Sequence, residues 1–236
     1  MGRRISERLL AWLYPDRCLM CARVIETSAR LCDTCMPEAP YIRRPMCKRC
    51  GRPRGLCMCR GHRRHFERAV APFLRTDVMC SAVSVLKQKA ARDVVYAFAY
   101  EMAEAVRREY GDTAFDMVTY VPLTRRDRRR RGHNQSELLA RELARELGMP
   151  CVKTLEKIVQ NRPQKELKAH ERIGNVLGVY DTCTDVRDKF ILLVDDVITT
   201  GSTLNECAKM LRLGGARQVF VVTAVAVPPS EKNEEE

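Results

Sequence analysis

Eight cysteines lie within 42 residues near the start of this 236-residue chain, and they constrain the fold of that part more than any other feature. The surrounding segment is rich in Arg, Pro and Gly and has little apolar periodicity, so it cannot bury enough apolar surface to fold without a staple. A Cys-x-x-Cys turn directs two thiolates at one tetrahedral ion, and two such turns complete a closed zinc site. The pairs are Cys18 and Cys21, Cys32 and Cys35, Cys47 and Cys50, and Cys57 and Cys59.

The spacing predicts two structural zinc sites of four cysteines each. The second is irregular, because one residue rather than two separates Cys57 from Cys59, so His62 or His65 stays an alternative ligand. Disulfides are the other interpretation of dense cysteines, but they belong to oxidising compartments. We expect a cytoplasmic protein without a membrane span, because the chain has no long apolar run and no h-region of a signal peptide.

The net charge of +12 is concentrated in the cysteine-rich part. Residues 1–68 hold 16 Lys and Arg against 6 Asp and Glu, and each four-thiolate zinc site would remove two positive charges from that excess. A basic segment suits nucleic acid or another polyanion. Only Tyr41 is aromatic among residues 15–65, which argues against strong base stacking there.

After residue 65, apolar strand-like runs alternate with helical patterns, which predicts an α/β domain with a largely parallel sheet. We therefore divide the chain into a cysteine-rich region at 1–65, an α/β domain at 66–229 and a disordered acidic tail at 230–236. The expected strands are 69–74, 115–121, 151–159, 190–194 and 219–227, and the expected helices are 91–110, 135–147 and 203–213. Asn134 is a candidate N-cap, and Gly148 a candidate end, of the second helix.

The stretch from Ile191 to Thr203 carries the strongest indication of a ligand. An apolar run leads into Asp195 and Asp196, and then into a loop of small hydroxyl residues around Gly201 before a helix. Parallel sheets bind ligands at the carboxyl ends of their strands, and a helix N-terminus suits a phosphate. The stretch has neither the Gly-Lys of a Walker loop nor three glycines of a dinucleotide fingerprint. Two carboxylates before a phosphate loop fit a ribose 5-phosphate.

This stretch resembles the binding motif for 5-phosphoribosyl 1-diphosphate (PRPP) of type I phosphoribosyltransferases. From about Leu9 to Val227, the chain as a whole resembles the ComF family of competence protein F and GntX-like proteins, which join a zinc ribbon to such a domain. The shared segments are Tyr14-Pro15-x-x-Cys18-x-x-Cys21, the later cysteine pairs, Val85-Leu86-Lys87 with Arg92, Val121-Pro122-Leu123, Arg131-Gly132-His133-Asn134-Gln135, and Gln164 through Glu171-Arg172-x-x-Asn175-Val176. His133 departs from the family, which usually has Phe there.

The resemblance implies roles for individual residues. Asp195 and Asp196 would hold the ribose hydroxyls as the catalytic pair, with Mg²⁺ nearby. The 5′-phosphate would lie against Thr199, Thr200, Gly201, Ser202 and Thr203. The diphosphate would lie against Leu123, Thr124 and Arg125, with Lys87 within reach, and a mobile loop carrying Gln164, Arg172 and Asn175 would close over the ligand.

Three functions follow from these expectations. The resemblance implies a PRPP-binding transferase-like protein, with an unidentified acceptor, that serves DNA uptake and natural transformation. The alternative is a non-catalytic zinc-ribbon adaptor for single-stranded DNA or competence proteins, with PRPP as a regulatory ligand. Nucleobase salvage is the third, and the fused zinc ribbon argues against it.

Overall fold

The computed structural model describes residues 17–25, 29–57, 59, 64–89, 92–111, 113–158 and 179–229. The expected mobile-loop residues Gln164, Arg172 and Asn175 lie outside the described residues, as do His62 and the acidic tail.

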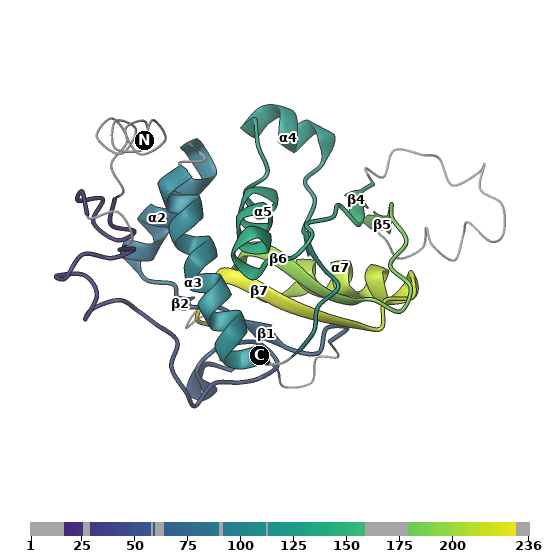
Figure 1. Ribbon diagram of the computed structural model, residues 1–236, viewed down its shortest axis with the longest axis horizontal. Coiled ribbons are helices and arrows are strands. Elements are labelled where there is room, and N and C mark those ends of the chain that lie inside the picture. Colours follow the sequence, from purple (N-terminus) through teal and green to yellow (C-terminus); the bar gives the residue numbers. More distant parts are fainter. Residues whose placement is uncertain are drawn as a thin grey trace, which may run out of the picture.

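A parallel sheet forms the centre of the molecule (Figure 1). Its strands are β1 (Ala69–Val70), β2 (Phe73–Leu74), β3 (Met117–Tyr120), β6 (Phe190–Ile198) and β7 (Gln218–Ala226). Strand β7 pairs with β1 and β2 on one side and with β6 on the other, and β6 pairs with β3. Residues 191–194 of β6 are fully buried, as the apolar run predicts for a strand covered on both faces.

Two expected strands differ from the structure. The run 69–74 is divided into β1 and β2 around Pro72, which has no N–H to donate to a ladder. The run 151–159 is not one strand: Cys151 bridges to Val118, and β4 (Leu155–Lys157) turns away to pair antiparallel with β5 (Tyr180–Thr182).

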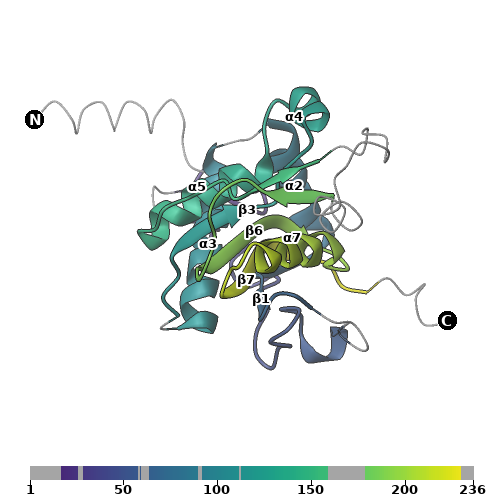
Figure 2. The same ribbon diagram turned by 90° about the vertical axis from the view of Figure 1, so that its right-hand side faces the viewer.

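Helices cover both faces of the sheet (Figure 2). Helices α3 (Arg92–Tyr110) and α5 (Gln135–Leu147) pack against each other on one face, and α7 (Ser202–Leu213) lies on the other, as right-handed crossovers require. Helix α2 (Asp77–Lys89) precedes α3. Asn134 caps α5 by accepting from the Ser136 amide at 3.1 Å, and Gly148 ends it with φ 67°, as predicted.

The arginine run after β3 forms a short helix, α4 (Arg125–Arg131), which is not among the helices expected from the sequence. Its N-cap is Thr124, whose Oγ1 accepts from the Asp127 amide at 2.9 Å. Gly132 ends it in the left-handed conformation. These two caps allow seven polar residues to form a helix without an apolar face, and α4 projects from the fold (Figure 1).

The cysteine-rich region packs against the α/β domain through its main chain. The Ile42 amide donates to Pro72 at 2.8 Å, and the Leu74 amide donates to Pro40 at 2.8 Å. Tyr41 forms an antiparallel bridge with Phe73, and their rings lie 4.7 Å apart. A 3-10 turn, η1 (Arg54–Leu56), completes this region. In the described part of the chain, no helix is long and apolar enough to cross a bilayer.

Candidate functional site

The loop between β6 and α7, residues 199–201, forms the centre of the candidate site. Strand β6 continues to Ile198, so Asp195 and Asp196 lie near its carboxyl end rather than after it. Helix α7 begins at Ser202, and Gly201 is its N-cap with φ 78°. The Thr200 and Ser202 hydroxyls lie 2.8 Å apart. The structure therefore brings both carboxylates, three hydroxyl residues and a helix N-terminus together at one sheet edge.

Asp195 is held by a residue that the sequence analysis did not single out. The Ser136 hydroxyl, in the first turn of α5, donates to Asp195 Oδ1 at 2.7 Å, and the Asp196 amide donates to the same oxygen at 3.0 Å. Burial, followed by the proximity of Asp196, raises the pKa of Asp195 to about 8. A cation bound nearby would favour the ionised form of this carboxyl. Ser136 and Asp195 are 59 residues apart in the chain, so no local sequence pattern predicts their contact.

The loop after β3 lies beside this edge. The Val121 amide donates to Val194 of β6 at 3.0 Å, and the Asn134 side chain donates to the Val121 carbonyl at 3.0 Å. Leu123 and Thr124 are partly buried. The Thr124 hydroxyl already donates to Asp127 Oδ2 at 2.8 Å, so a diphosphate would have to share it.

The segment with Lys87 also reaches this region through the main chain. Lys87 lies in the last turns of α2, next to Leu86, whose carbonyl is 3.3 Å from His133 Nε2. His133 stands between α4 and α5, where the resemblance expects Phe, and its second contact is the Gln135 side chain at 3.4 Å. Lys87 is thus close in the fold to the α4–α5 connection.

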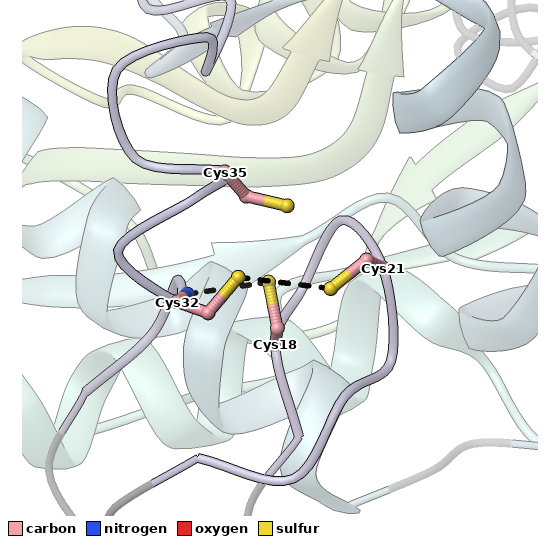
Figure 3. A group of neighbouring side chains, drawn as sticks. All are labelled: Cys18, Cys21, Cys32 and Cys35. Atoms are coloured by element: carbon pink, nitrogen blue, oxygen red, sulfur yellow. Dashed lines mark hydrogen bonds between the residues drawn. The ribbon is translucent and has the colours of Figure 1, made fainter.

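The first cysteine cluster fits a tetrahedral zinc ion. The four sulfurs of Cys18, Cys21, Cys32 and Cys35 lie within 4.8 Å of one another, and their side chains point to a common centre (Figure 3). The Cys21 and Cys32 sulfurs are 3.7 Å apart, close to the roughly 3.8 Å edge of a tetrahedron with Zn–S of about 2.3 Å. The Cys32 amide donates to Cys18 Sγ at 3.4 Å, as in a zinc knuckle.

The second cluster consists of Cys47, Cys50, Cys57 and Cys59, so the irregular Cys-x-Cys pair joins it. Sulfur separations of 3.9 Å link Cys47 to Cys59 and Cys50 to Cys57. Burial and the neighbouring thiols raise the pKa of Cys59, so this thiol keeps its proton unless a cation displaces it. The backbone amide of His65 donates to Asn205 at 2.7 Å, and His65 is not among the four clustered ligands.

Two arginines of the cysteine-rich region contact main-chain carbonyls of the β6–α7 loop, which was not predicted from the sequence. Arg52 is fully buried and donates to the carbonyls of Ile198 at 3.1 Å, Val227 at 2.6 Å and Thr199. Arg64 donates to the Thr200 carbonyl at 2.8 Å. A Cβ on Gly201 would lie 2.9 Å from Arg64 Nη1. Glycine therefore allows both the positive φ at this position and the close approach of the Arg64 side chain to the loop.

A polar cavity of about 300 Å³ lies beside Arg64 at the junction of the two regions. Three arginines, Arg49, Arg64 and Arg212, line it together with His65, Phe66 and Glu67. Its charge suits an anion.

Comparisons with known proteins agree with this two-part construction. A double zinc ribbon domain matches residues 9–69, and a phosphoribosyl transferase domain matches residues 133–236. The DNA utilization protein YhgH of Salmonella typhimurium is 31% identical over 210 residues, which cover 86% of this chain and 87% of that protein. This chain belongs to the ComF family. Competence protein F of Haemophilus influenzae is 38% identical over 110 residues, 45% of this chain and 48% of that one.

Solved structures that resemble part of this chain include two enzymes. Glutamine PRPP amidotransferase from B. subtilis matches with 24% identity and a TM-score of 0.39, over 55% of this chain and 26% of that one. A hypoxanthine-guanine phosphoribosyltransferase from Bacillus anthracis matches with 14% identity and a TM-score of 0.37, over 60% of this chain and 73% of that one. This ComF-family chain thus spans about a quarter of the amidotransferase.

Proposed function

We propose that this ComF-family protein binds PRPP at the carboxyl ends of β3 and β6 and acts in the handling of DNA. The observation that carries the proposal is the β6–α7 connection: two carboxylates, a left-handed glycine and a helix N-terminus with three hydroxyl residues, Thr199, Thr200 and Ser202, follow one another within eight residues. The names of the relatives, a DNA utilization protein and a competence protein, support the DNA context.

Each residue has a role that its position allows. The amides from Thr200 to Thr203 would receive the 5′-phosphate, since a helix N-terminus carries a partial positive charge. Asp195 and Asp196 would accept from the ribose hydroxyls, with Ser136 fixing the Asp195 carboxyl. Leu123, Thr124 and Arg125 would adjoin the diphosphate, with Lys87 near them. When bound, Mg²⁺ supplies neutralising charge to the diphosphate, mainly through ligand oxygens and water.

If the protein is a transferase, its residues would accelerate loss of the diphosphate from C1 of the ribose. Holding the phosphate and ribose fixes the ring, and cations around the diphosphate stabilise the negative charge that develops as it leaves. The nucleophile comes from an acceptor whose identity the described residues do not specify.

The test is calorimetric titration of the zinc-loaded protein with PRPP and Mg²⁺. Wild type should bind, and Asp195→Asn/Asp196→Asn should bind at least about tenfold more weakly, because each amide has no charge and only one acceptor oxygen for the ribose hydroxyls. Asp185→Asn, which changes an exposed carboxylate paired with Arg187, is the matched control and should bind as wild type does. A zinc-loaded wild type that does not bind PRPP would overturn the proposal.

The adaptor is the second candidate function, favoured by the arginine-lined cavity between the two regions. It predicts salt-dependent binding of single-stranded DNA that persists in the double aspartate variant. Base-dependent release of pyrophosphate across the common nucleobases would instead indicate salvage.

A further inference from the structure

The second cysteine cluster surrounds the arginine that contacts the phosphate loop. Arg52 lies between Cys50 and Cys57 in the chain, and its carbonyl accepts from the Cys47 amide at 2.7 Å. The Gly51 amide donates to the Cys47 carbonyl at 2.9 Å, which closes the turn. The ligands of one metal site therefore fix the main chain on both sides of Arg52.

The same turn is pressed against the sheet. Gly51 has φ 71°, and a Cβ there would lie 2.9 Å from the Ala69 carbonyl oxygen of β1. The Ala69 amide donates to the Lys48 carbonyl at 3.3 Å. The position of the cluster relative to the sheet is thus set by backbone contacts, which leave little room for adjustment.

Burying the charged Arg52 guanidinium costs free energy unless other interactions compensate for it. Its side chain is fully buried, it donates to three main-chain carbonyls, and within the described residues it forms no ion pair with a carboxylate. A buried charge without a counter-charge is unfavourable. Next to a loop that receives phosphate, the same charge becomes favourable when an anion arrives.

The contacts also decide where the loop amides point. In a trans peptide the carbonyl of one residue and the N–H of the next point in opposite directions. Arg52 holds the carbonyls of Ile198 and Thr199, and Arg64 holds that of Thr200. The N–H groups of Thr199, Thr200 and Gly201 are therefore directed away from the two arginine side chains.

We propose that Arg52 is a positioning residue for the phosphate loop, and that zinc at Cys47, Cys50, Cys57 and Cys59 is required for phosphate binding at Thr199–Thr203, whereas zinc at the first cluster is not. The inference rests on the proposed function for the identity of the ligand. The ordering of the loop by Arg52 does not depend on it.

The experiment compares two arginines of the cysteine-rich region. Arg52→Gln removes the contacts with the loop. Arg30→Gln is the matched control, because the guanidinium of Arg30 lies over Tyr96 and Tyr100 of α3, at 4.2 and 4.4 Å from the ring centroids. Three quantities are measured for each: zinc content, amide hydrogen exchange of residues 198–205, and PRPP binding with Mg²⁺.

Arg52→Gln should keep two zinc ions per chain, increase loop exchange at least about tenfold and weaken PRPP binding at least about tenfold, as expected for loss of a charged hydrogen-bond donor. Arg30→Gln should leave loop exchange and PRPP binding as in wild type. Unchanged exchange in Arg52→Gln, or equal changes in both variants, would overturn the proposal. If Arg52→Gln does not fold, Arg64→Gln, which removes one contact from the partly exposed side, makes the same comparison.

Two cysteine variants test the metal. Cys59→Ser should retain one zinc ion and show the loop exchange of Arg52→Gln, whereas Cys21→Ser should retain one zinc ion and keep the loop protected. A protected loop in a Cys59→Ser protein that has lost one zinc ion would refute the metal dependence. If wild type fails to bind PRPP while Arg52→Gln still loosens the loop, the proposed function fails and the positioning role stands.

Discussion

The two cysteine clusters share one ligand chemistry but differ in what they contact. The first includes an exposed cysteine, Cys21. Arg30, which precedes its ligand Cys32 by two residues, packs against aromatic side chains of α3. The second has two buried cysteines, Cys50 and Cys59, and surrounds Arg52, which reaches main-chain carbonyls at the end of the central strand. Two clusters with the same four-thiolate ligand set thus lie next to different parts of the α/β domain, the first beside α3 and the second beside β1 and the end of β6.

The largest difference should appear in stability. Cys50→Ser should lower the free energy of unfolding by about 3–5 kcal/mol, because Cys50 is only 1% exposed and its loss frees the turn packed on β1. Cys21→Ser, at the exposed edge of the first cluster, should lower it by less. Denaturant unfolding with zinc analysis measures both, and equal losses would contradict the comparison.

The pH dependence of stability should differ between Asp195 on β6 and the cysteine clusters. The pKa of Asp195 is raised to about 8 from an ordinary value of 3.8, so the folded protein keeps a proton that the unfolded chain releases. The contribution of Asp195 to stability should therefore fall as the pH rises from about 4 to about 8, by on the order of a few kcal/mol. Zinc-thiolate stability changes in the opposite direction, because acid protonates the ligands.

Asp195→Asn isolates the Asp195 contribution. Unfolding measured between pH 6 and 8 should show a smaller decline in this variant than in wild type, with zinc content unchanged. Leu213, which is exposed at the end of α7, offers Leu213→Gln as a control that should keep the wild-type slope. Parallel slopes for wild type and Asp195→Asn would refute the assignment.

Gly201→Ala should cost about 1–3 kcal/mol, because alanine is strained at φ 78° and its Cβ would meet Arg64. PRPP binding should also be lost, because the added Cβ would push the loop and the Arg64 side chain apart. Gly148→Ala also faces a positive φ but has open space around it, so it separates backbone strain from contact with Arg64. Thermal unfolding and calorimetry of the two variants provide the measurement, and equal losses of PRPP binding would contradict a role for Arg64.

The smallest effect is expected for Arg30→Gln, at about 1–2 kcal/mol, the order of two partly exposed cation–π contacts. Denaturant unfolding should detect it. A loss above about 3 kcal/mol would mean that the first cluster contributes more than a local staple.

Much of this protein could be predicted from local sequence. Residues 191–194 form a continuous apolar run and residues 219–226 a run interrupted only by Thr223, and such runs become buried parallel strands because both faces are covered. The cysteine spacing predicted both metal clusters, since a turn of fixed length places two sulfurs within reach of one ion. The caps of α5 followed from Asn134 and Gly148.

Other features depended on contacts between segments distant in the chain. Helix α4 was not predicted, although the residues that cap it, Thr124 and Gly132, directly flank it in the sequence. Cys151 bridges to the central sheet, but β4 pairs outside that sheet with β5, which lies more than twenty residues later in the chain. Asp195 is contacted by Ser136, 59 residues away in the chain, and Thr199 of the β6–α7 loop is contacted by Arg52, about 147 residues away.

The sequence by itself determined the chemistry of the parts: thiolate pairs, a two-carboxylate strand end and a glycine before a helix, each encoded by neighbouring residues. Only the tertiary structure decided how the parts act on one another. The buried Arg52 guanidinium donates to the carbonyls of Ile198, Thr199 and Val227. These contacts form only when the cysteine-rich region has packed against the sheet.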